Sequence, residues 1–304
     1  MQSTAPGVMQ IQSGIRNQRA RPYPVFRLMQ AIQQRPGSGG EKQLEGPTPA
    51  EKEQIETAGA VRAEQPRAET GTIKIDLHCH SEASIDCSTP LSLIPARCLA
   101  RGIRVQAITD HNQIWGAQKL LELVEREEVE GARGLTIIPG EEVSSRDGEI
   151  IGLFLHELIP PGLSAEETVE RIKDQGGLVV IPHGFDPLKR WRLKPAALQR
   201  ITPRVDVVET FNARISDIRW NQAAVDWAKA KGVPMSAGSD AHTLADIGSA
   251  WTEAAWRPVS GPEDLLQALE GAIPVGEWTH PVLAFLFKAW DRTRRRFRAG
   301  RTRS

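Results

Sequence analysis

Short apolar runs and amphipathic stretches alternate along the middle of the chain. Runs rich in β-branched residues predict strands, whereas apolar residues three or four positions apart predict helices. Strands are expected at 73–77, 105–109, 135–138, 149–155, 178–181, 205–209 and 234–237. Helices are expected at 90–101, where Thr89-Pro90 supplies a start signal and Gly102 a stop signal, and at 115–128, 164–176, 216–231 and 262–269.

This alternation predicts an α/β fold. Repeated strand-then-helix units imply parallel strands with helices packed outside the sheet. In barrels of this kind the functional site lies at the carboxyl ends of the strands. Residues 251–256 and the helix at 262–269 are expected to close the domain.

The two ends of the chain differ from this middle part. Residues 1–70 are dominated by Gln, Pro, Gly, Glu and Arg and have no sustained apolar period, so we expect a disordered or over-extended tail. Residues 72–278 are expected to form the folded domain, and 279–304 an amphipathic helix with a basic tail. Docking of that helix on the domain is our preferred interpretation, and contact of its Arg cluster with a membrane surface or RNA stays open.

Composition narrows the function classes only slightly. The formal net charge is 0, so the whole chain has no bias toward nucleic acid or membranes; nucleic acid stays possible but is not indicated. The three cysteines lack CxxC spacing, which argues against a disulfide framework and favours a cytoplasmic location. No apolar run approaches the ~20 residues that a membrane-spanning helix needs. The oligomeric state is not predicted.

The histidines gather at the ends of predicted strands. Five of the seven lie in short motifs of this kind. His78 and His80 stand two residues apart, so in an extended chain their rings point the same way, as ligands of one metal ion must. The motifs are Asp76-Leu77-His78-Cys79-His80-Ser81, Thr109-Asp110-His111, Pro139-Gly140-Glu141-Glu142, Ile181-Pro182-His183 and Gly238-Ser239-Asp240-Ala241-His242.

In this order, the five motifs resemble those of the PHP (polymerase and histidinol phosphatase) family of metal-dependent phosphoesterases, over about residues 72–256. The resemblance implies a distorted barrel of seven β/α units. It also implies two or three divalent ions, often Mn, Zn or Fe, and cleavage of phosphate esters.

The resemblance further implies a set of metal ligands. His78, His80, Glu142 and Asp240 would hold one ion, Glu142 would bridge to a second ion bound by His183, and Asp86, His111 and His242 would form a third group. Two positions depart from the family pattern. Glu149 stands where many members carry His, and Asp86 where some do. Oxygen in place of nitrogen shifts preference toward harder ions such as Mn.

The expected reaction is attack on phosphorus by a hydroxide that the ions generate. The substrate would be a phosphate mono- or diester, such as a small metabolite, a nucleotide or a short oligonucleotide. Asp240 or His242 would transfer protons to the leaving group. Arg214 is the preferred phosphate contact, and the other candidates are Lys189, Arg190 and Arg192.

Two other functions stay open. Amidohydrolases and deaminases are metal-dependent barrel hydrolases that also begin with His-x-His, although the Thr-Asp-His and Gly-Glu-Glu motifs count against them. A PHP-like module that binds a partner without catalysis is the other possibility, because Asp86 and Glu149 replace expected ligands.

Overall fold

The computed structural model describes residues 71–278, and the strands and helices named below are those of this range. Nine strands form one sheet in the order β7-β6-β5-β4-β3-β2-β1-β8-β9. The strands are β1 (Thr72–Asp76), β2 (Ile103–Ile108), β3 (Thr136–Ser145), β4 (Gly148–Leu153), β5 (Leu178–Ile181), β6 (Val207–Asn212), β7 (Met235–Gly238), β8 (Ala250–Ala255) and β9 (Ile273–Gly276).

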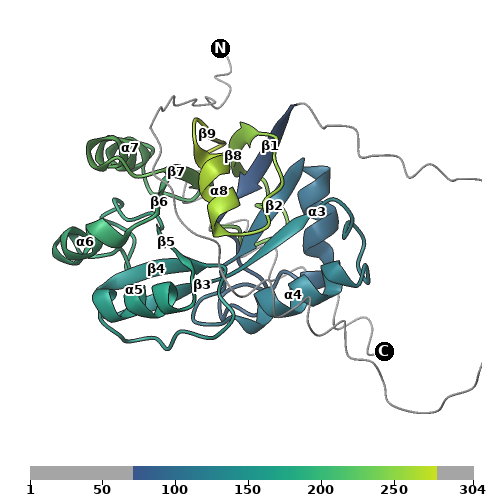
Figure 1. Cartoon of the computed structure of the whole chain (residues 1–304), viewed down its shortest axis with the longest axis horizontal. Coiled ribbons are helices and arrows are strands. Elements are labelled where there is room, and N and C mark those ends of the chain that lie inside the picture. The colour runs from purple at the N-terminus through teal and green to yellow at the C-terminus, as the bar shows by residue number, and fades with distance from the viewer. Residues whose placement is uncertain (1–70, 279–304) are drawn as a thin grey trace, which may run out of the picture. The chain divides into compact units, whose positions relative to one another are not determined.

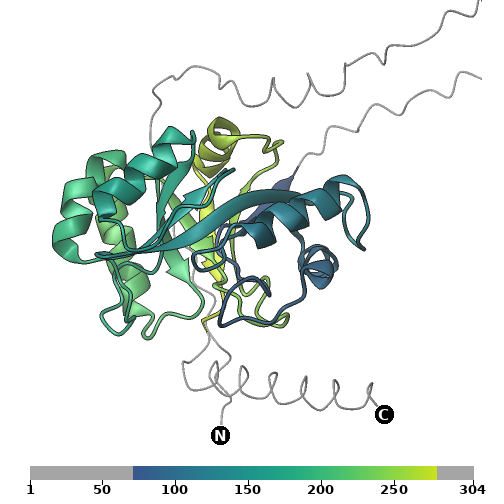
Figure 2. The same ribbon diagram turned by 90° about the horizontal axis from the view of Figure 1, so that it is seen from below.

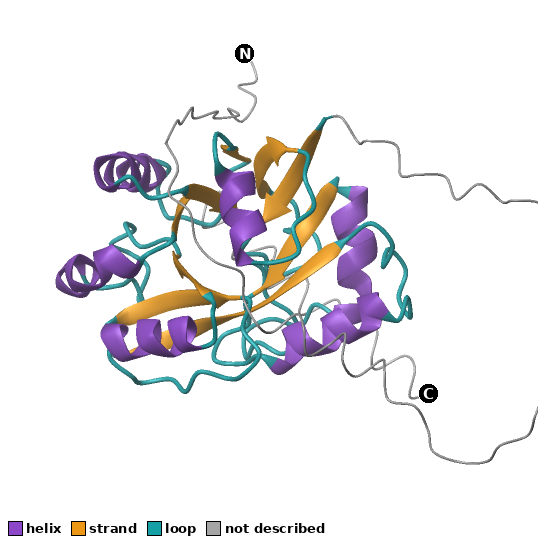
Figure 3. Cartoon of the chain, viewed as in Figure 1, coloured by secondary structure: helices purple, strands orange, loops and turns teal. Residues whose placement is uncertain are grey.

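The helices lie outside the curved sheet (Figures 1 and 3). They are η1 (Leu91–Leu93), α3 (Ile94–Ala100), α4 (Trp115–Glu125), α5 (Ala165–Asp174), α6 (Pro195–Ile201), η2 (Thr202–Arg204), α7 (Arg219–Lys231) and α8 (Pro262–Leu269). The expected helix at 90–101 is divided into η1 and α3, with Pro95 in the first turn of α3. The sequence reading missed the short helix α6.

The sheet is mixed, which corrects the expectation that all strands are parallel. β1, β2 and β3 run parallel, as do β5, β6 and β7, but β4 is antiparallel to both β3 and β5. The turn between Ser145 and Gly148 is too short for the helical crossover that parallel strands need, so β3 and β4 form a hairpin. Figure 2 shows the long β3 strand crossing the molecule.

The two halves of the sheet curve toward each other and nearly close. The Leu77 N–H donates to the Ala237 carbonyl at 3.4 Å, and the Ala237 N–H donates to Thr252 Oγ1 at 2.9 Å, so β7 meets the segment after β1 and also β8. This confirms the α/β barrel-like fold. The seven predicted strands correspond to β1–β7, and β8 and β9 extend the sheet beside β1.

β3 is longer than its sequence suggests. The apolar run ends at Ile138, but Gly140 to Ser145 continue the strand by pairing with β4. Glu142 therefore lies within a strand, whereas the sequence placed it after a strand end.

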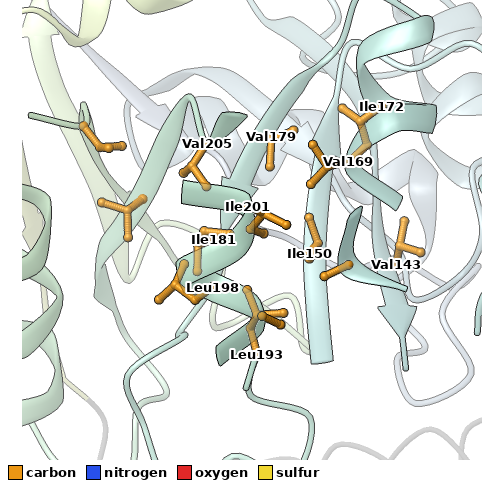
Figure 4. Packing of buried hydrophobic residues seen from close by; sticks show 14 of the residues in the cluster. Val143, Ile150, Val169, Ile172, Val179, Ile181, Leu193, Leu198, Ile201 and Val205 are labelled. Carbon is orange, nitrogen blue, oxygen red and sulfur yellow. The ribbon is translucent and has the colours of Figure 1, made fainter. Parts of the chain in front are cut away.

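Buried aliphatic side chains hold the helices against the sheet. One cluster joins Val179 and Ile181 of β5 to Val169 and Ile172 of α5 and to Leu198 of α6 (Figure 4). The predicted start of α5 is confirmed. Ser164 Oγ accepts a hydrogen bond from the Glu167 N–H at 3.2 Å, and the Glu167 carboxylate accepts one from the Ser164 N–H at 2.8 Å.

The expectations for 1–70 and 279–304 lie outside the described residues. Between residues 71 and 278 no helix has the length and apolar character required to cross a membrane. Cys79, Cys87 and Cys98 are buried and free in the described residues.

The fold predicts a large stability difference between two leucine truncations. Leu153 of β4 is fully buried, whereas Leu158 is 48% exposed. Leu153→Ala should lower the free energy of unfolding by about 2–5 kcal/mol, because it removes buried methyl groups and leaves a cavity. Leu158→Ala should change it by less than about 0.5 kcal/mol. Urea unfolding measures both, and equal losses would contradict this packing.

Candidate metal centre

The two histidines after β1 converge, as their spacing predicts. His78 and His80 are each 1% exposed, and their Nε2 atoms lie 3.2 Å apart. Cys79 packs with buried apolar side chains that include Ile94 and Leu120. Burial raises the pKa of the Cys79 thiol well above its usual range, which fits its expected role as a packing residue.

Glu142 joins these histidines to a second group of side chains. Its Oε2 lies 3.3 Å from Nε2 of His78 and 3.4 Å from Nε2 of His80. Its Oε1 lies 3.0 Å from Nε2 of His183, and Oε2 is also 3.1 Å from Nδ1 of His111. Glu142 thus occupies the centre of the cluster, where a bridging ligand would stand.

Glu149 reaches the same cluster from β4. Its Oε1 is 3.6 Å from Nδ1 of His111, and its Oε2 is 3.6 Å from Nε2 of His183. The hairpin explains this position, because antiparallel pairing places Glu149 opposite Ser144, two residues beyond Glu142. Burial and the nearby Glu142 carboxylate raise the pKa of Glu149.

Asp240 and His242 enter from the segment after β7. Asp240 Oδ1 lies 3.8 Å from Nε2 of His78 and 3.5 Å from Nε2 of His80. His242 Nε2 lies 2.8 Å from Asp86 Oδ2. Asp86 is the most exposed of the candidate ligands, and its Oδ1 is 3.9 Å from Nε2 of His111.

The structure therefore brings all nine candidate ligands together. Eight of the nine place their donor atoms in four overlapping groups of three, and within each group the atoms lie within 4.8 Å of one another. The groups are His78-His80-Glu142, His78-His183-Asp240, His111-Glu142-Glu149 and His80-His111-His242, and Asp86 adjoins the last group through His242.

Hydrogen bonds around the cluster orient lone pairs inward. His78 Nδ1 lies 3.1 Å from Glu209 Oε1, and His242 Nδ1 lies 2.8 Å from the Asp240 carbonyl oxygen. Both partners are acceptors, so in the neutral rings Nδ1 carries the hydrogen and Nε2 presents a lone pair. Lone pairs and carboxylate oxygens facing each other at these distances need positive charge between them. The donor set therefore fits divalent cations.

Protonation of the histidines alone does not supply the positive charge that the cluster needs. Burial opposes charge on His78, but Glu142, Glu209 and Asp240 outweigh burial and raise its pKa well above the usual range. Burial, His242 and His111 instead lower the pKa of His80 well below that range. Protonation of His78 but not of His80 leaves part of the negative charge of the carboxylates without a neighbouring positive charge. A bound cation would supply that charge.

Glu209, at the end of the predicted strand 205–209, is a residue that sequence reasoning missed. Its Oε1 faces His78, while its Oε2 accepts hydrogen bonds from the His183 N–H at 2.7 Å and from Asn212 Nδ2 at 3.0 Å. It thus orients two candidate ligands at once. A carboxylate at a strand end was the available signal, but no motif marked it.

Local backbone geometry is also adapted to the site. A Cβ added to Gly238 would lie 2.0 Å from Glu209 Oε1 and 2.4 Å from His78 Cβ, so only glycine fits there. His183 and Asp240 have φ of 27° and 50°. Non-glycine residues rarely adopt such angles, which occur preferentially at functional sites.

Two cations contact the Asp240 side of the cluster. Lys189 Nζ lies 2.7 Å from Asp240 Oδ2, and Arg214 Nη1 donates to the Asp240 carbonyl at 3.1 Å. Arg190 instead lies over the ring of Trp191, 5.0 Å from its centroid. Arg192 lines a hollow beside α6 and α7. Of these four candidate phosphate contacts, Lys189 and Arg214 are the two that the structure places at Asp240.

A near-closed α/β barrel with clustered histidines and carboxylates at one end of its strands is the arrangement that the motifs imply. The family model described as PHP domain matches residues 76–179, and the model described as PHP-associated matches residues 219–272. The chain belongs to the PHP family.

Curated relatives extend the comparison. An uncharacterized protein of Methanocaldococcus jannaschii is 35% identical over 196 residues, covering 64% of this chain and 75% of that protein. A second uncharacterized protein of the same organism is 38% identical over 164 residues, covering 51% and 90%. A 5'-3' exoribonuclease of Haemophilus influenzae is 28% identical over 130 residues, covering 39% and 45%.

Solved structures share the fold at low identity. A two-domain protein from Bacteroides vulgatus, described as containing a predicted PHP-like metal-dependent phosphoesterase, is 16% identical with a TM-score of 0.53, covering 68% of this chain and 66% of that one. PsfC from Pseudomonas syringae is 19% identical with a TM-score of 0.54, covering 73% and 99%.

The orienting role of Glu209 predicts a specific loss of metal affinity. In Glu209→Gln, the amide group would face either His78 Nδ1–H or the His183 N–H, so one donor would lose its acceptor. Metal affinity, measured by competition with a chelator, should fall about 10–100-fold.

The matched control is Glu270→Gln, a change at an exposed carboxylate beyond α8. This variant should keep the wild-type affinity. Wild-type affinity in Glu209→Gln itself would show that Glu209 does not orient the ligands.

Proposed function

We propose that this chain is a metal-dependent phosphoesterase that hydrolyses a phosphate mono- or diester of a small substrate. The observation that carries the proposal is the cluster around Glu142, where imidazole nitrogens and carboxylate oxygens meet in overlapping groups of three, each with its atoms within 4.8 Å of one another. Membership of the PHP family supports it. A cytoplasmic location belongs to the same proposal, since the three cysteines are free and buried.

The proposed cofactors are two or three divalent ions, Mn, Zn or Fe, because mixed imidazole and carboxylate ligation suits these metals. His78, His80, Glu142 and Asp240 would hold one ion, and Glu142 with His183 and Glu149 a second, as the distances among their donor atoms allow. Asp86, His111 and His242 would complete the third group. Bound ions would lower the pKa of a water molecule, to about 7 in the case of zinc, and would neutralise phosphate charge.

The chain's own residues would orient the substrate and move protons. Arg214 is held at the Asp240 carbonyl, where its guanidinium can also bind a phosphate oxygen. His242 is fixed by its Nδ1 bond to Asp240, which turns Nε2 toward Asp86 and the cluster. With two ions bound, we propose that the lone pair of His242 Nε2 takes a proton from the attacking water and passes it to the leaving oxygen. Asp240 would stay ionised, because burial opposes its charge but Lys189 and His78 outweigh burial and hold its pKa well below the usual range.

A substrate screen tests this proposal. The protein, loaded with Mn or Zn, is assayed on phosphate monoesters, phosphodiesters, amides and aminopurines. Phosphate esters should be hydrolysed, and His80→Ala should reduce the rate by about 100-fold or more, since it removes a ligand from the centre of the cluster.

His156→Ala is the matched control, because His156 is exposed and lies outside the cluster. It should keep the wild-type rate. Undiminished activity in His80→Ala would place the reaction elsewhere. Hydrolysis of amides or aminopurines alone would favour an amidohydrolase, and absence of any hydrolysis would favour a non-catalytic module.

A further inference from the structure

The loop at residues 184–194, between β5 and α6, is fixed near both ends. Asp186 accepts hydrogen bonds from the Ser216 N–H at 2.7 Å and the Ser216 hydroxyl at 2.6 Å. At the other end, the Lys194 N–H donates to the Asp147 carbonyl, and the Glu149 N–H donates to the Trp191 carbonyl, both at 2.7 Å. The loop therefore holds a defined position beside the metal centre.

Lys189 projects from this loop onto Asp240. Its Nζ lies 2.7 Å from Asp240 Oδ2, while Asp240 Oδ1 lies toward His78 and His80. The ammonium group has three donors, and the Lys189 side chain is 26% exposed. Lys189 can therefore keep its contact with Asp240 while it donates to an anion that enters from solvent.

Arg214 places a second cation on the same residue. It donates to the backbone carbonyl of Asp240, whereas Lys189 contacts the side chain. Two cations at one side of the cluster should bind more tightly the phosphate group that has more negative charge and more non-bridging oxygens. A phosphate monoester carries up to two negative charges and three non-bridging oxygens, whereas a diester carries one charge and two such oxygens.

The other basic residues of the loop are directed elsewhere. Arg190 is exposed and lies over Trp191, and Arg192 lines the hollow beside α6 and α7. Of the three basic side chains at 189–192, Lys189 is therefore the one that points toward Asp240.

We propose that Lys189 is a substrate-binding residue that contacts the phosphate beside Asp240 and favours phosphate monoesters over diesters. The inference rests on the proposed function and adds to it the substrate class. It assigns to Lys189 a role in binding the anion, separate from any role in holding metal.

Direct binding of inorganic phosphate to the Mn-loaded protein tests the assignment. Titration calorimetry should show that Lys189→Met weakens phosphate binding by about 10-fold or more, the range expected for a charged hydrogen bond. Lys189→Arg should recover part of the affinity. Arg190→Met, which removes a positive charge from the same loop, should bind phosphate like the wild type. Metal content should be equal in all four proteins.

Hydrolysis provides the second measurement. The ratio of kcat/KM for p-nitrophenyl phosphate to that for bis-p-nitrophenyl phosphate should fall about 10-fold in Lys189→Met and stay constant in Arg190→Met. Equal losses on both esters, unchanged phosphate affinity, or loss of bound Mn from Lys189→Met would each overturn the assignment. Wild-type protein that neither binds phosphate nor cleaves either ester would overturn the proposed function itself.

Discussion

The buried carboxylate of Glu142 sets the electrostatic constraint on which the site depends. Its two oxygens face the ring nitrogens of His78, His80 and His183, and the Glu149 carboxylate lies beyond. Glu209 and the Asp240 carbonyl fix the outer nitrogens of two rings, so lone pairs point inward. Such an interior is stable only with positive charge at its centre, which is the physical reason to infer bound metal.

The barrel-like fold brings candidate ligands from distant parts of the sequence close together around Glu142. Parallel strands deliver side chains after β1, β2, β5 and β7, and the β3–β4 hairpin adds Glu142 and Glu149 from one unit. Gly238 leaves the space in which Glu209 approaches His78. The unusual φ angles of His183 and Asp240 show that the surrounding packing holds two ligands in costly conformations.

Sequence reasoning reached the α/β class, the strands β1–β7 and the candidate ligands, because periodicity and short motifs are local signals. It missed β9 and the antiparallel direction of β4, because local hydrophobic periodicity does not determine which strands pair or in which direction they run. Glu209 carried no motif, and its role follows only from its contact with His78, for which Gly238 of β7 leaves the space. Likewise, the sequence favoured Arg214 among four basic candidates, and only tertiary contacts separated Lys189 from Arg190 and Arg192.

Anomalous diffraction from crystals grown with Mn(II) tests the central claim most directly. At least two anomalous peaks are expected among the donor atoms of the cluster, one of them in contact with both His78 and Glu142. A map with no peak within ligand distance of Glu142 would contradict the inference that this buried carboxylate is built to bind metal.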